Sequence, residues 1–135
     1  MTTAPQRTIQ TRIGRRVYLS AAYRDSRGLM KGHNFILEAS VRGPVHSDSG
    51  MILSIQELDA MIKSVGHKYD HQYLNELPEF HNITVSTELL AQSCFQQLNE
   101  KIGQLPGLTL DKIRLYESDD YWVDVGQHLS PEIDT

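Results

Sequence analysis

The 135-residue sequence has a single cysteine, Cys94, so it cannot form an intrachain disulfide or a zinc site built from several cysteines. It also lacks any apolar run near the ~18 residues that a membrane-spanning helix requires, and residues 1–10 lack the apolar core of a signal peptide. The formal net charge of −4 gives no excess of the positive charge that nucleic-acid-binding proteins carry. These absences predict a cytoplasmic protein that binds neither nucleic acid nor a membrane.

The composition that remains is typical of one globular domain. Hydrophobic residues make up 39% of the chain and charged residues 22%. A chain of this length buries roughly two-thirds of its unfolded surface, which is enough for a real core. No internal repeat or linker interrupts the sequence. We therefore predict a single domain over residues 8–126, with loose termini at residues 1–7 and 127–135.

Hydrophobic periodicity predicts the order of the secondary-structure elements. Residues 8–24 and 33–42 alternate between apolar and polar positions, which favours two strands. A helix follows, with Ser54 as its cap and Gly66 as its expected end, and residues 86–103 form a second helical pattern.

Residues 113–117 and 121–125 alternate again and predict a returning pair of strands. The order is thus strand, strand, helix, helix, strand, strand. It predicts an α+β domain in two layers, with a four-stranded antiparallel sheet and both helices on one face.

Short segments that carry recognisable motifs follow one another through most of this domain. They are YLSAAYR (residues 18–24), MKGHNF (30–35), VRG (41–43), GMI (50–52), YDHQYLN (69–75), VSTE (85–88) and YES (116–118). In this order they resemble the F-x-A-A-H-R, H-G-H-N-Y, V-x-G, G-M-V, L-D-H-x-x-L-N, P-T-S-E and E-T elements of the 6-pyruvoyl/6-carboxy-tetrahydropterin synthase family. The resemblance implies a tunnelling fold that assembles into trimers and hexamers, with strands closing a barrel and active sites between protomers of a homo-oligomer.

The resemblance also implies which positions correspond to the zinc ligands of the family. Three histidines hold zinc there, and the matching positions here are Tyr23, Lys31 and His33. A lysine ammonium repels a dication, and a tyrosine hydroxyl is a poor zinc ligand near neutral pH. We therefore predict a site without zinc or another cofactor, the alternative being a zinc site rebuilt from other residues. In the simplest reading, Lys31 is solvated and His33 packs without a role.

Catalytic residues other than the metal ligands are partly kept. The family's cysteine base corresponds to Arg27 or Ser26, and Cys94 cannot replace it because it lies on the apolar stripe of the second helix. Asp70 and His71 match the family's proton-relay pair, in which the aspartate orients the histidine. Adjacent Asp and His residues also occur by accident on protein surfaces.

The expected ring-binding residues match as well. Glu117 corresponds to the carboxylate that accepts hydrogen bonds from the ring N–H and the exocyclic amine of the pterin, a two-point match to a planar 2-amino-4-oxo edge. Ser86, Thr87 and Glu88 are expected to complete the pocket, and Tyr23 and His33 to line it. Ser86 and Thr87 could equally be plain helix caps, and Glu117 an ordinary exposed glutamate.

Two functions follow from this combination. The first is a divergent lyase- or isomerase-type enzyme that acts on a reduced pterin or a similar heterocycle, with or without an anionic side chain. In it, Lys31 and Arg27 replace the metal and the thiol while Asp70 and His71 move a proton. The second is a non-catalytic pterin-binding or structural homologue that kept the fold and the Glu117 pocket.

Overall fold

The computed structural model describes residues 9–127. The expected loose ends at residues 1–7 and 127–135 therefore lie outside the described residues, apart from Gln127. The long elements are β1 (Thr11–Arg24), β2 (Met30–Gly43), α1 (Ile55–Tyr69), α2 (Thr87–Gly103), β4 (Thr109–Ser118) and β5 (Tyr121–Val125). Three short ones lie between the helices: β3 (Gln72–Tyr73) and the 3-10 turns η1 (Leu74–Glu76) and η2 (Pro78–Phe80). The predicted order of strands and helices is confirmed.

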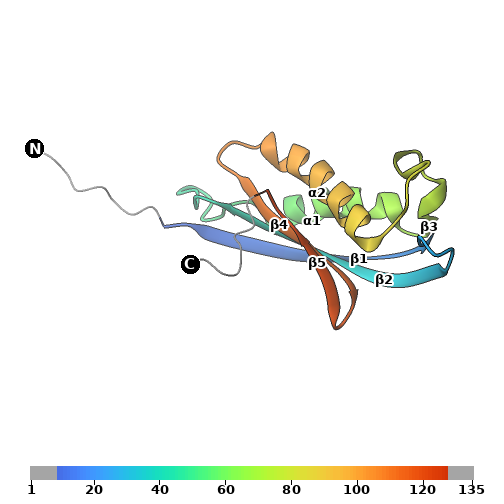
Figure 1. Cartoon of the computed structure of the whole chain (residues 1–135). Helices are drawn as coiled ribbons and strands as arrows, with labels where there is room; N and C mark the ends of the chain where they lie inside the picture. The colour runs from blue at the N-terminus through green and yellow to red at the C-terminus, as the bar shows by residue number, and fades with distance from the viewer. Residues whose placement is uncertain (1–8, 128–135) are drawn as a thin grey trace, which may run out of the picture.

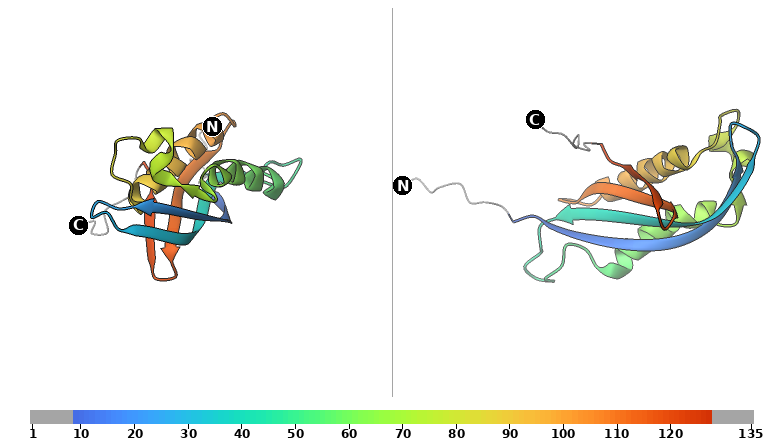
Figure 2. Two further views of the ribbon diagram at one scale, coloured as in Figure 1. Left: turned by 90° about the vertical axis from the view of Figure 1, so that its right-hand side faces the viewer. Right: turned by 60° about the horizontal axis from the view of Figure 1, so that its bottom comes forward.

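The sheet has the strand order β3-β1-β2-β4-β5. The four long strands pair antiparallel, as predicted, and both helices lie over one face of the sheet (Figure 1). The prediction of four strands was incomplete, because β3 adds a fifth strand that runs parallel to β1 over two residues. Two residues are too few to show an alternating pattern. The long β1–β2 pair curves strongly along its length (Figure 2).

Both helices begin at the predicted caps. The Ser54 hydroxyl accepts from the backbone N–H of Glu57, which is one half of the predicted capping box. The Glu57 carboxylate accepts from the Ser54 hydroxyl and not from its backbone N–H. Ser86 caps α2 by accepting from the N–H of Leu89. The predicted end of α1 at Gly66 is wrong, because the helix continues to Tyr69. A Cβ on Gly66 would stand 3.3 Å from Cγ2 of Val17, so this glycine allows close packing of α1 on β1 instead of ending the helix.

The core lies between the two helices and the face of the sheet that they cover. Alternate residues of the strands point into it, and the fully buried ones include Phe35, Leu37, Ile113 and Leu115. The opposite face carries Tyr18 and Trp122, which are 68% and 44% exposed. Within residues 9–127, no helix is long and apolar enough to cross a membrane.

Candidate functional site

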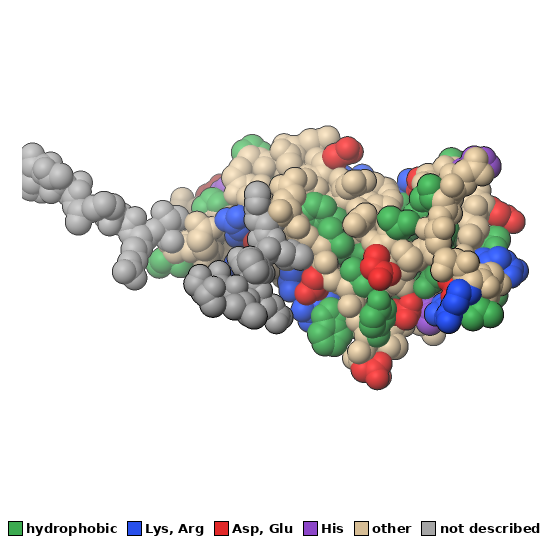
Figure 3. All heavy atoms as spheres, in the orientation of Figure 1, with side chains coloured by type: hydrophobic (Ala, Val, Ile, Leu, Met, Phe, Trp, Pro, Cys, Tyr) green, Lys and Arg blue, Asp and Glu red, His purple; other side chains and the backbone are tan. Residues whose placement is uncertain are grey.

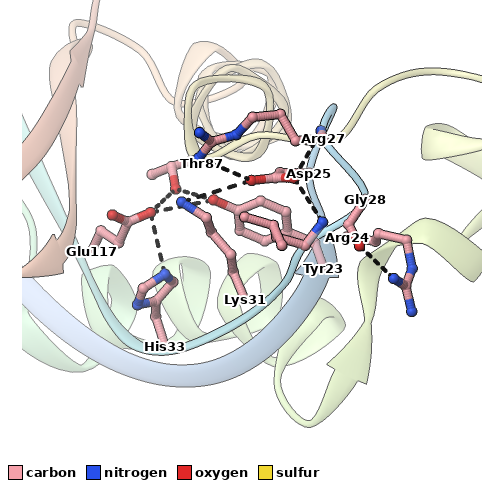
Figure 4. A network of polar contacts seen from close by, with 10 residues as sticks. Tyr23, Arg24, Asp25, Arg27, Gly28, Lys31, His33, Thr87 and Glu117 are labelled. Atoms are coloured by element: carbon pink, nitrogen blue, oxygen red, sulfur yellow. Dashed lines mark hydrogen bonds and ion pairs between the residues drawn. The ribbon is translucent and has the colours of Figure 1, made fainter.

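The candidate site lies where the β1–β2 turn, the start of α2 and the end of β4 meet (Figure 4). Tyr23 of β1 stands directly opposite Lys31 of β2, and His33 follows two residues later on the same face of the strand. This face is the one that the helices cover, so the three side chains approach Thr87, the first residue of α2. The alternation of β4 directs Glu117 toward the same place.

Glu117 is the centre of a small hydrogen-bond network. Its Oε1 accepts from Oγ1 of Thr87 at 2.5 Å and from the hydroxyl of Tyr23 at 3.3 Å. The Tyr23 hydroxyl also lies 3.2 Å from Oγ1 of Thr87. Thr87 is 2% exposed, and Tyr23 4%. One oxygen of the carboxylate is thus fixed by two buried side chains, which sets the orientation of the whole group.

Burial shapes the chemistry of Tyr23. Desolvation is the main cause that raises the pKa of its hydroxyl. The hydrogen bond to Thr87 is the next largest effect and opposes the rise, while the Glu117 and Glu88 carboxylates add smaller contributions that raise the pKa. Tyr23 therefore stays protonated near neutral pH and acts as a hydrogen-bond donor. This is a different role from that of a metal ligand, which would require the phenolate.

His33 lies beside Glu117 without a hydrogen bond. Its Nε2 is 3.4 Å from Oε1 of Glu117, but the geometry is not that of a hydrogen bond, and this buried nitrogen has no hydrogen-bond partner among the described residues. The ring packs edge-on against Phe35, with 5.5 Å between centroids. His33 therefore keeps an unused polar atom beside the carboxylate.

The β1–β2 turn brings Asp25 into the site, a residue that was not among the predicted site residues. Oδ1 of Asp25 accepts from the backbone N–H groups of Arg27 and Leu29, at 2.9 and 3.0 Å. Oδ2 lies 3.8 Å from Nζ of Lys31 and 3.9 Å from a guanidinium nitrogen of Arg27. The N–H of Leu29 is the largest of several causes that hold the pKa of Asp25 below its usual value, so this carboxylate is ionised at neutral pH.

Several of these residues line a hollow of 300 Å³. Of the residues predicted for the site, Tyr23, Lys31, Ser86, Thr87, Glu88 and Glu117 line it. Ser26 lines it as well, whereas Arg27 does not and has a side chain that is 73% exposed. Tyr121 of β5 is a further lining residue that the sequence reasoning missed, because its position in the β4–β5 hairpin gives no local signal of a site.

His71 lines a different hollow, and Asp70 lies beside it. Nδ1 of His71 is 3.1 Å from Oδ1 of Asp70, which itself accepts from the backbone N–H of Ser20 at 2.7 Å. The His71 backbone has φ +61°, which is unusual for a residue other than glycine, and its N–H donates to the carbonyl of Ser20 at 2.6 Å. The imidazole is 81% exposed and lines a hollow of 520 Å³.

Among residues 9–127, none lines both hollows, and His33 lies between them. It lines the His71 hollow, while its Nε2 lies against Glu117 of the other. The structure therefore brings together the residues expected to bind the ring but does not place Asp70 and His71 among them. Figure 3 shows that Lys/Arg, Asp/Glu and His side chains all reach the surface at this end of the molecule, around the β1–β2 turn.

The side chains at the three positions that correspond to the family's zinc ligands do not fit zinc. Only His33 offers a donor that suits the metal, because Tyr23 keeps its proton and Lys31 brings a positive charge. Across residues 9–127, no group of three or more His, Cys, Asp or Glu side chains is arranged to hold a metal ion.

Comparisons with known proteins agree with this fold. Residues 13–128 match the family described as "6-pyruvoyl tetrahydropterin synthase". A putative 6-carboxy-5,6,7,8-tetrahydropterin synthase of Archaeoglobus fulgidus is 31% identical over 98 residues, which are 73% of this chain and 76% of that protein. A 6-pyruvoyl tetrahydrobiopterin synthase of Dictyostelium discoideum is 42% identical over 69 residues, and the match spans only about half of each chain, 50% and 51%.

Among solved structures, the 6-pyruvoyl tetrahydropterin synthase of Caenorhabditis elegans superimposes with a TM-score of 0.76 and 20% identity. The superposition covers 90% of this chain and 98% of that one. At this level of identity the likeness concerns the fold.

Proposed function

The chain belongs to the 6-pyruvoyl tetrahydropterin synthase family, and we propose that it is a zinc-independent enzyme that acts on a reduced pterin or a similar 2-amino-4-oxo heterocycle. The observation that carries the proposal is the Glu117 carboxylate, which Thr87 and Tyr23 hold at the wall of a hollow large enough for a small heterocycle. The family supplies the ligand class, and the network supports a site that is still organised to bind it.

Glu117 provides the recognition of the ring. The 2-amino-4-oxo edge presents two parallel N–H donors, and a carboxylate accepts two such bonds in one plane. Oε1 is held by Thr87, while Oε2 has no hydrogen-bond partner among residues 9–127. The Tyr23 hydroxyl can turn its hydrogen toward Oγ1 of Thr87, at 3.2 Å, which frees a lone pair of Oε1 for the ligand. The rotation of one O–H thus opens a two-point binding edge.

Lys31 provides a positive charge where the family has its metal. Its side chain is 37% exposed and lines the same hollow as Glu117. A fixed ammonium group near a substrate oxygen stabilises the negative charge that develops on it when a neighbouring carbon loses a proton. In our proposal this replaces the polarising effect of zinc, and Arg27 adds a second cation at the rim.

His71 moves the proton in our proposal, and the His71 that serves a given site comes from a second protomer. Nδ1 of His71 lies 3.1 Å from Oδ1 of Asp70, so the carboxylate favours the neutral tautomer with its proton on Nδ1, and that tautomer leaves Nε2 as the proton acceptor. Because His71 is exposed and lies outside the Glu117 hollow of its own chain, the complete site is proposed to form between protomers. Free strand edges support such an assembly. Within the described residues, no strand pairs with the outer edge of β5, and along residues 11–19 of β1 no strand pairs with the edge that faces away from β2.

A binding experiment tests the recognition of the ring. Dihydroneopterin is titrated into the metal-free protein and the dissociation constant is followed by fluorescence. Glu117→Gln turns one acceptor oxygen into an N–H₂ group that faces the ligand's own donors, so we expect about tenfold weaker binding or worse. Glu100→Gln, which removes the same charge from an exposed position on α2, is the control. Equal affinity in Glu117→Gln and the wild type would refute the proposed pocket.

A turnover experiment separates an enzyme from a binding protein. Product formation from the same ligand is measured after chelation of metals, with His71→Ala as the comparison. Turnover that survives chelation and is lost in His71→Ala supports the proposal. Tight binding with no turnover of any reduced pterin would favour the non-catalytic homologue instead, and turnover that returns only with added zinc would overturn the metal-free mechanism.

A further inference from the structure

The two cations of the β1–β2 turn already have a carboxylate between them. Asp25 points its Oδ2 toward both Lys31 and Arg27, at 3.8 and 3.9 Å (Figure 4). These distances are longer than hydrogen bonds, so each cation keeps donors for another partner. The positive charges are nevertheless compensated within the chain before any ligand arrives.

Asp25 is held rigidly in this place by the turn itself. Its backbone N–H donates to the carbonyl of Leu29, and its own carbonyl accepts from the N–H of Gly28, each at 2.9 Å. Gly28 has φ +79°, a conformation that suits glycine and closes the turn. Oδ1 accepts two further N–H groups, and the side chain is only 15% exposed. These hydrogen bonds therefore hold the carboxylate beside Lys31.

The charge of the hollow is negative as a result. Its ionisable lining consists of the carboxylates of Asp25, Glu88 and Glu117 and the single ammonium of Lys31, a formal net charge of −2. Glu88 and Glu117 also contribute, after burial, to raising the pKa of the lining residue Tyr121, which reflects the same negative environment. Such a hollow attracts a neutral or cationic ligand and disfavours an anionic one.

We propose that Asp25 is a specificity-determining residue, whose carboxylate takes the place that an anionic substituent of the ligand would occupy beside Lys31 and Arg27. The site then accepts a 2-amino-4-oxo heterocycle with an uncharged side chain and rejects the same heterocycle with a phosphate or carboxylate on that side chain. This inference rests on the proposed function, because it assumes that Glu117 binds the ring. It assigns Lys31 to polarising an oxygen of the ligand and not to pairing with an anion.

The test compares dihydroneopterin with its monophosphate, which shares the ring and adds only the anionic group. The wild type is expected to bind the uncharged compound about tenfold more tightly, as repulsion between like charges at a partly exposed site predicts. Asp25→Asn keeps an amide oxygen for the N–H groups of Arg27 and Leu29 and removes the charge, so it leaves two cations without a counter-ion. In that variant the ratio of the two dissociation constants is expected to approach one or to reverse.

Glu100→Gln controls for the change in net charge, and its ratio should equal that of the wild type. Two results would overturn the inference alone: a wild type that binds the phosphate ester as tightly as the uncharged compound, or an Asp25→Asn variant whose ratio is unchanged while its thermal stability matches the wild type. The proposed function would be overturned as well if the wild type bound neither compound, or if Glu117→Gln bound them as tightly as the wild type. Raising the salt concentration should shrink the wild-type ratio, because the discrimination is electrostatic.

Discussion

Removing the hydroxyl of Thr87 isolates the contact that orients Glu117. Thr87→Val keeps the shape of the side chain, so no cavity forms, but it takes away the donor that binds Oε1 at 2.5 Å. Both groups are shielded from water, with Thr87 2% exposed and the Glu117 side chain 18%. A hydrogen bond to a charged group contributes about 1.5–3 kcal/mol to stability. The valine has no hydroxyl to remove from water on folding, so the expected loss of unfolding free energy lies at the lower end of this range.

We therefore expect Thr87→Val to lose about 1.5 kcal/mol of unfolding free energy, or about 5 °C in melting temperature for a domain of this size. Urea unfolding and thermal melts measure this loss directly. Binding of dihydroneopterin should weaken about tenfold in the same variant, because one oxygen of the carboxylate is no longer fixed. Thr109→Val, at an exposed position of β4, is the matched control. Unchanged stability and unchanged binding in Thr87→Val would refute the view that this contact organises the site.

Two further predictions concern metal and pH. Tyr23 faces Lys31 across the strands, and His33 shares their face. The double variant Tyr23→His/Lys31→His should therefore retain about one zinc per chain in elemental analysis, whereas the wild type should retain far less. A wild type that retains one zinc per chain would contradict our account of the site. The hydrogen bond from the N–H of Ser20 is the main cause that holds the pKa of Asp70 below its ordinary value. The ionised Asp70 therefore stabilises the folded state above the unfolded pKa of about 4, and this contribution is lost as pH falls through the lower folded pKa. Urea unfolding at a series of acidic pH values should show a shallower loss of stability in Asp70→Asn, and an identical slope would speak against this contribution.

Local patterns in the sequence were enough to predict the order of the strands and helices and to identify the family. Alternation along the long strands and the caps at Ser54 and Ser86 predicted where strands and helices form, because each depends on neighbours within a few residues. Gly66 misled the prediction, since a glycine that ends a helix and one that lets a helix approach a strand look alike in sequence. The two-residue strand β3 was missed because it depends on β1, which lies about fifty residues earlier in the chain.

The sequence by itself determined that Tyr23 and Lys31 stand at two positions where the family has zinc ligands, since residue identity at a motif position needs no coordinates. Only the tertiary structure decided that Thr87 and Tyr23 both hold Glu117, that Asp25 lies between Lys31 and Arg27, and that His71 belongs to a separate hollow. These contacts join residues from different strands and a helix end. Their geometry depends on how β1, β2, β4 and α2 pack together, and local periodicity carries no information about it.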